Sequence, residues 1–184
     1  MKRAAPILAL AIGGVLACGG GGGADAPASG LVYVDPSGPG YRFVRNPELS
    51  SASHLVLDLM GPDGDRARGV AFTLELGAGP ARWAKVAPED PQYLENLLFD
   101  LGPGIPLLKS ALQGDTTLLA DAFQKGPGNE KVMAGPICRV ALDSQGPPSG
   151  ANISISVVRF QLRPPTGAGL ADAPCAVGKI TFLR

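Results

Sequence analysis

Residues 69–76 read GVAFTLEL, and this stretch decides the fold class. Val70, Phe72 and Leu74 alternate with Ala71 and Thr73, which places one face of a β-strand in a core and the other face in water. A helix cannot satisfy this alternation, because its side chains repeat every 3.6 residues rather than every two. The centre of the chain is therefore expected to be β-sheet.

Similar short apolar runs lie on both sides of residues 69–76, and turn residues separate them. The chain has 26 Gly and 18 Pro, which is high for a helical protein. We expect strands at residues 31–34, 41–44, 54–60, 69–76, 116–123, 137–142, 153–162 and 177–183, with a register break near Val158. Residues 81–86 and 107–112 would bring the total to eight to ten strands, which predicts an all-β, two-sheet sandwich in one domain.

Three local details stay open at this level. Residues 31–34 and 41–44 form either a hairpin or a strand–loop–strand unit. Periodicity alone cannot assign residues 107–112 and 116–123 between helix and strand, because the second run fits a period of 3.6 as well as a period of two; turn residues on both sides of 116–123 favour a strand there. Within the irregular stretch 88–106, residues 93–98 are expected to form a short helix.

The first thirty residues are organised as an export signal followed by a tether. Lys2 and Arg3 give a positive start, residues 4–16 are apolar, and residues 15–18 read VLAC. The apolar stretch is too short for a transmembrane helix. VLAC resembles the lipobox of bacterial lipoproteins, although Val15 stands where that family most often has Leu. The resemblance implies that residues 1–17 are a signal peptide and that Cys18 carries lipid; an ordinary signal peptide with an incidental cysteine is the alternative.

Residues 18–30 are expected to be the lipidated cysteine and a glycine-rich tether, and residues 31–184 the single folded domain. The run GGGGGADAPAS at residues 19–29 cannot hold regular structure. A leash of about twelve residues has a mean reach of roughly 20 Å, which lets a domain clear the lipid headgroups. Two or three acyl chains make such an anchor stable. Gly19 replaces the Asp that retains lipoproteins in the inner membrane, so the resemblance implies the outer membrane of a Gram-negative envelope.

The chain has three cysteines, an awkward number for an exported protein. Assigning Cys18 to lipid leaves Cys138 and Cys175, which we expect to form a disulfide. It would close a loop of about 38 residues and stabilise the domain by around 4 kcal/mol. Two buried thiols are the alternative. Neither cysteine has a histidine or a second cysteine nearby, so no metal site is expected.

The sequence offers no catalytic set, so we expect no enzyme and no cofactor. His54 is the only histidine, and its place beside an apolar run is typical of a strand end. No Gly-x-Ser-x-Gly motif is present. Nucleic acid is excluded as a partner on charge: without Lys2 and Arg3 the chain has 14 basic and 16 acidic residues, and no basic cluster.

From Leu55 onward, the order of segments resembles cohesin-like modules, which are related to carbohydrate-binding modules. The segments that carry the resemblance are GVAFTL at residues 69–74, FQKG at 123–126, GPICRVAL at 135–142, the run 153–162 and GKITF at 178–182. The resemblance implies a cohesin-like antiparallel β-sandwich of jelly-roll type. It also implies a partner, either a dockerin-like protein or a polysaccharide.

Trp83 is the one candidate binding residue for a polysaccharide, because sugars stack on exposed aromatic rings. A position in the core or at its rim is the alternative for this single tryptophan. The sequence therefore predicts a membrane-anchored lipoprotein with a non-catalytic, cohesin-like module that binds a protein or a polysaccharide. A structural envelope lipoprotein without a specific ligand is the alternative.

Overall fold

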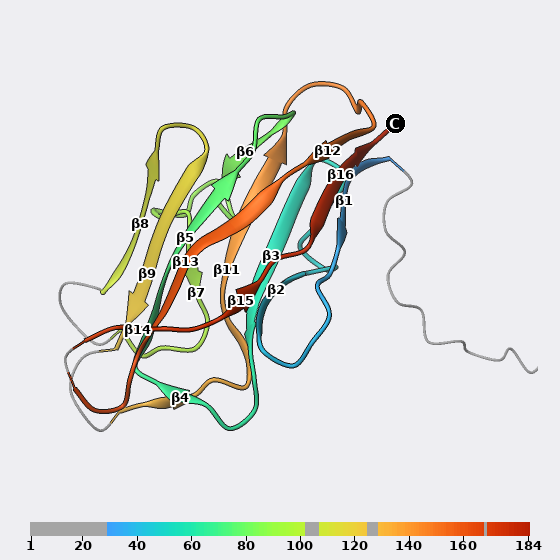
Figure 1. Cartoon of the computed structure of the whole chain (residues 1–184). Coiled ribbons are helices and arrows are strands. Elements are labelled where there is room, and N and C mark those ends of the chain that lie inside the picture. Colours follow the sequence, from blue (N-terminus) through green and yellow to red (C-terminus); the bar gives the residue numbers. More distant parts are fainter. Residues whose placement is uncertain (1–28, 102–106, 125–128, 168) are drawn as a thin grey trace, which may run out of the picture.

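A computed structural model describes residues 29–101, 107–124, 129–167 and 169–184. These residues form a β-sandwich in which two sheets lie face to face, and no helix is found among them (Figure 1). Accordingly, no helical segment in these ranges could cross a membrane. The expectation of an all-β sandwich is confirmed.

One layer is a six-stranded sheet, and the other is a five-stranded sheet. The first runs in the order β15 (Cys175–Ala176), β2 (Tyr41–Arg45), β3 (His54–Gly61), β11 (Gly135–Ser144) and β6 (Ala81–Ala84), and β7 (Glu95–Asn96) also pairs with β11. The second runs in the order β14 (Ala171–Asp172), β13 (Ile155–Arg163), β5 (Gly69–Leu76), β9 (Thr117–Phe123) and β8 (Leu108–Gln113). All neighbouring strands are antiparallel except β15 and β2.

Two smaller sheets complete the fold. β1 (Gly30–Val34), β16 (Lys179–Leu183) and β12 (Ala151–Ile153) form a three-stranded sheet in which the first and last strands of the domain pair. β4 (Arg66–Ala67) and β10 (Lys131–Val132) form a short ribbon at the opposite end of the sandwich (Figure 1). The domain is therefore closed by its own terminal strands.

The core lies between the two large sheets. Phe43 of β2 contacts Phe72 of β5 edge to face, with 5.4 Å between the ring centroids, and Tyr41 lies 5.0 Å from Phe160 of β13. The remaining inward side chains are mainly leucines, which include Leu55, Leu57, Leu59, Leu74 and Leu118. Burial of these alternating positions is what holds the register of each strand.

Residues 69–76 are a strand with the bounds expected from their alternation. The register break is also confirmed, because β13 skips a residue against β5 between Val157 and Arg159, which leaves Val158 as a bulge. Residues 108–113 form a strand rather than a helix. β1 and β2 are a strand–loop–strand unit, since β1 pairs with β16 and β2 with β3.

Two expectations were wrong. The helix at residues 93–98 is absent, because Asn96 bonds its own segment in a non-helical way: its side chain donates to the Phe99 carbonyl and accepts from the Phe99 N–H. The N–H groups of Leu97 and Leu98 donate to Ile137 in β11 instead. The described residues also form sixteen strands rather than eight to ten, because five strands have only two residues and the run 153–162 is divided between β12 and β13.

Candidate binding face and edge cleft

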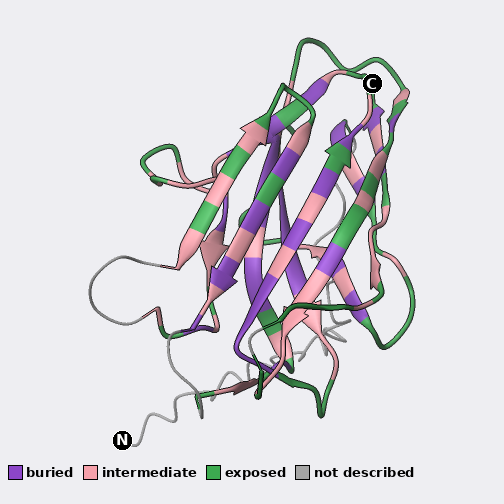
Figure 2. Ribbon diagram, turned by 60° about the vertical axis from the view of Figure 1, so that its left-hand side comes forward, coloured by how far each residue is buried: buried purple, intermediate pink, exposed green. Residues whose placement is uncertain are grey.

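The outward side of the five-stranded sheet, formed by β13, β5, β9 and β8, is an uncovered surface that we call the open face. Figure 2 shows buried and exposed residues alternating along these strands. The pairing register places Ala111, Leu119, Thr73 and Arg159 in one row across four strands. Leu119 is 37 % exposed and Val158 of the bulge is 59 % exposed. The middle of the open face therefore carries Ala111, Leu119 and Thr73, with the charged Arg159 at one end of the row.

Charged side chains lie around this row. Lys109 and Asp121 face one another across β8 and β9. Partial burial raises the pKa of the Asp121 carboxyl, and Lys109 opposes that shift. Arg163 lies over the ring of Phe123, 5.8 Å from its centroid. Opposite charges on the margin leave the open face without a strong excess of either sign.

The outward side of the six-stranded sheet is covered by its own residues. Val56 and Ala141 are buried there in a small second core with Ala84, and Val86 packs against it. Next to this core, Arg139 donates to Asp58 at 2.9 Å and lies 3.4 Å from Glu95. This side of the sandwich offers less open surface to a partner than the open face does.

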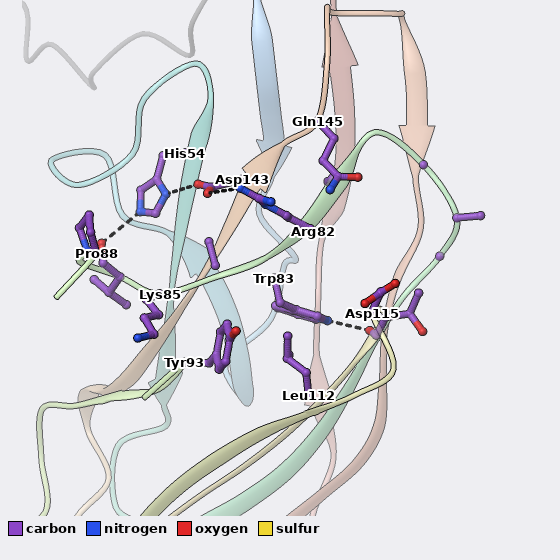
Figure 3. A pocket seen from close by; sticks show the side chains of 17 residues that line it. His54, Arg82, Trp83, Lys85, Pro88, Tyr93, Leu112, Asp115, Asp143 and Gln145 are labelled. Carbon is purple, nitrogen blue, oxygen red and sulfur yellow. Dashed lines mark hydrogen bonds and ion pairs between the residues drawn. The ribbon is translucent and has the colours of Figure 1, made fainter. Parts of the chain in front are cut away.

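A cleft of about 780 Å³ runs beside β6, and we call it the edge cleft (Figure 3). Its apolar part is made by Trp83, Tyr93 and Leu112. Its polar side chains are His54, Arg82, Lys85, Asp115, Asp143 and Gln145. The cleft combines an apolar middle with a polar margin, which is the usual make-up of a ligand site.

Trp83 lies at the inner wall of the edge cleft. It is 4 % exposed, and its indole N–H donates to the Thr116 carbonyl at 2.7 Å. Tyr33 and Tyr41 are also buried. A planar platform for sugar rings needs exposed aromatic faces, and these three rings face the core.

His54 is the first residue of β3, as expected for a strand end. Its Nδ1 lies 2.7 Å from Asp143 Oδ1, and its Nε2 lies 3.2 Å from the Val86 carbonyl. Arg82 is 3.8 Å from the second oxygen of Asp143. Each ring nitrogen of His54 therefore lies beside an oxygen of the protein itself.

The described ranges hold no group of three or more His, Cys, Asp or Glu side chains placed to bind a metal ion. Sequence reasoning missed the edge cleft, because its lining comes from strands β3, β6, β8 and β11 and from the turns between strands, which are far apart in the sequence. The residue pattern that could have revealed it is the polar run beside Trp83, in which Arg82 and Lys85 flank the indole.

The prediction of a disulfide is wrong, because Cys138 and Cys175 are free thiols. Cys138 is in β11 and Cys175 is in β15, and strands β3 and β2 lie between them in the sheet. Each strand spacing is about 4.8 Å, so the two cysteines are not the cross-strand neighbours that a disulfide requires. Burial raises the pKa of Cys175 to about 12 and raises that of Cys138 as well, so neither is a reactive thiolate.

Cys18, the signal peptide and most of the tether lie outside the described residues, as do residues 125–126 of the FQKG segment. Ser29 and Gly30 are the first described positions, and Gly30 opens β1. The tether would therefore join the domain at the three-stranded sheet.

No protein-family model matches the chain, and no curated protein matches its sequence. Among solved structures, it is similar to the cohesin module of a family 33 glycoside hydrolase from Clostridium perfringens ATCC13124, with a TM-score of 0.39 and 12 % sequence identity. The similarity covers 81 % of this chain and 97 % of the cohesin module. We infer function from the surfaces of the chain itself.

Proposed function

We propose that this protein is a non-catalytic binding module, tethered to the cell envelope, whose open face docks a partner protein. The observation that carries the proposal is the uncharged part of the central row, formed by Ala111, Leu119 and Thr73 on three paired strands. With the exposed Val158 beside it, this row gives a partner apolar contact area on a rigid sheet. Rigid, partly apolar surfaces with paired charges at the rim are typical of protein interfaces.

A protein partner fits better than a polysaccharide. A polysaccharide binder stacks sugars on several exposed rings, whereas Trp83, Tyr33 and Tyr41 are buried. Phe123 is the one aromatic side chain on the open face, and the Arg163 guanidinium lies over its ring. The open face therefore offers contact area without sugar-stacking rings.

The location in our proposal is the outer membrane, reached through lipid on Cys18. The VLAC sequence and the glycine run support this anchor. A tether of about twelve residues would leave the open face free to meet a partner at roughly 20 Å from the bilayer. The domain would act as a receptor on the envelope surface.

A photo-crosslinking amino acid at Thr73, in the full chain in its native cells, tests the proposal. Ser37 is the matched control position, because it is exposed in the loop between β1 and β2, away from the open face. We expect a discrete protein adduct from position 73 and none from position 37. Adducts that are absent from position 73, or equal from both positions, would contradict docking at the open face and favour a structural envelope lipoprotein.

A further inference from the structure

β6 is the end strand of the six-stranded sheet, and in the described chain no strand pairs with its other side. The register fixes which backbone groups face that side. The Gln145 N–H donates to the Pro80 carbonyl at 2.7 Å, and hydrogen-bonded pairs recur every second residue in an antiparallel ladder. Arg82 and Ala84 therefore direct their N–H and C=O groups to β11. Ala81 and Trp83 direct theirs outward, to the unpaired edge.

The edge cleft runs along this unpaired edge. Every residue from Ala81 to Val86 lines it, although neighbouring strand residues point to opposite faces. Its volume of about 780 Å³ is within the range of ligand sites. The chain leaves the edge after Lys85, because the Val86 carbonyl accepts a hydrogen bond from the His54 ring on the outward side of the sheet. That turn keeps the edge clear.

The facing edge, on β8, is protected in a way that β6 is not. The backbone N–H of Ser110 in β8 donates to the Gln92 side chain at 2.8 Å, and the Tyr93 N–H donates to the Ser110 hydroxyl at 2.7 Å. Such caps stop an exposed edge from pairing with another chain. In the described residues no side chain caps the outward groups of Ala81 or Trp83 in this way. β6 is therefore a free template for one more strand.

The charges in the edge cleft select what that strand carries. Lys85 and Asp115 lie on opposite sides of Trp83 (Figure 3). Within the described chain, neither takes part in an ion pair. Between them, Trp83, Tyr93 and Leu112 give an apolar middle. The cleft complements an extended segment that has an apolar centre, an acidic residue placed beside Lys85 and a basic residue placed beside Asp115.

We propose that the edge cleft binds an extended peptide segment of a partner protein, which adds to β6 as a further strand. Backbone hydrogen bonds to Ala81 and Trp83 give the affinity, and an acidic side chain opposite Lys85 gives the specificity. The site belongs to the six-stranded sheet, so it is separate from the open face and goes beyond the proposed function. Either site can fail without the other.

Trp83 is the only tryptophan of the chain, so its fluorescence reports on the edge cleft directly. The test uses the full chain purified in detergent and the acetylated, amidated heptapeptide KTVTVTE. We expect a saturable change in Trp83 emission, which the same peptide N-methylated on alternate residues fails to produce. K85E should weaken binding of KTVTVTE about tenfold, equivalent to roughly 1.4 kcal/mol. It should restore binding to the peptide KTVTVTK.

Two further variants separate this site from others. A81P removes one outward N–H without touching the pairing with β11. It should weaken binding of the peptide KTVTVTE about fivefold or more. T73R, on the open face, should leave peptide binding unchanged. The proposal is overturned if the heptapeptide gives no saturable signal at millimolar concentration, or if its N-methylated form binds equally well. A response to cellohexaose without a response to the peptide also overturns it, and assigns the cleft to a glycan.

Discussion

Arg139 lies on the outward side of β11 between two acidic side chains. Its Nε donates to Asp58 at 2.9 Å, and Asp58 also accepts from the Asn46 side chain at 2.8 Å. Asp58 is 9 % exposed, so its charge depends on these two donors rather than on water. A buried carboxylate that loses its cation is left with an uncompensated charge.

R139A is therefore expected to lower the free energy of unfolding by about 3 kcal/mol. R42A is the matched control, because Arg42 is on the same sheet and its guanidinium bonds the Gly40 carbonyl at the surface. We expect R42A to lower the free energy of unfolding by less than about 0.5 kcal/mol. Urea unfolding followed by circular dichroism measures both, and equal effects of the two variants would refute a special role for Arg139.

Tyr33 and Tyr41 make stability depend on alkaline pH. Burial is the main cause that raises the pKa of each phenol above its ordinary value near 10. The Tyr33 hydroxyl donates to the Phe43 carbonyl at 2.9 Å and accepts from the Gly178 N–H at 2.6 Å. The folded state therefore holds these protons at a pH where the unfolded state releases them.

We expect full stability below the unfolded pKa values and a steady loss above about pH 9 to 10, where the free thiols and phenols ionise first in the unfolded chain. Urea unfolding between pH 7 and 11 measures this loss. Y33F should lower stability by about 1 to 2 kcal/mol at pH 7 but show a weaker fall above pH 10. An unfolding free energy that stays constant up to pH 11 would contradict the assignment.

At the scale of elements, the bulge in β13 controls which side chains face the core. Ile155 and Val157 lie before the skipped residue and pack against the core, while Phe160 follows it and is also buried. Val157 and Phe160 are three positions apart, so both can point inward only because the bulge takes Val158 out of the alternation, which has a period of two. The exposed bulge on the open face is thus part of the core's register.

Deletion of Val158 is expected to lower the free energy of unfolding by less than about 1 kcal/mol, because it joins Val157 directly to Arg159 and simple alternation then keeps Ile155, Val157 and Phe160 on the inward face. V158A keeps the register and should cost less than about 1 kcal/mol. Chemical unfolding of both variants makes the comparison. A loss of about 3 kcal/mol or more on deletion, with none for V158A, would contradict the role of Val158 as the extra residue of the register.

Alternation predicted the strands where one face is buried, as in residues 69–76, and even the break at Val158. It failed where a polar side chain bonds its own backbone, as Asn96 does, since such contacts do not show in a hydrophobic pattern. The disulfide between Cys138 and Cys175 was predicted from the number of cysteines, and that count carries no information on strand order, which keeps the two residues apart. The open face could be anticipated from the polar half of the alternation. The edge cleft could not, because no periodicity states which strand ends a sheet.

At the scale of the whole molecule, the lipid anchor is the proposal that most needs a direct measurement. C18A should move the protein from the membrane fraction to the soluble fraction, because the acyl chains supply the affinity for the bilayer. C175A is the matched control and should stay with the membrane. Fractionation and intact mass of the mature N-terminus provide the readout, and an unacylated wild-type N-terminus at another residue would refute the anchor.

The pairing of β1 with β16 joins Gly30 to Leu183 and Val34 to Lys179, across almost the entire length of the domain. Contacts between residues so distant in sequence form slowly, because a large loop must close before they are gained. β1 would emerge first from a secretion channel and then wait, unpaired, until the final strand had followed it. The pairing that closes the folded sandwich would therefore form last, and the chain would stay unfolded while it passes through the channel.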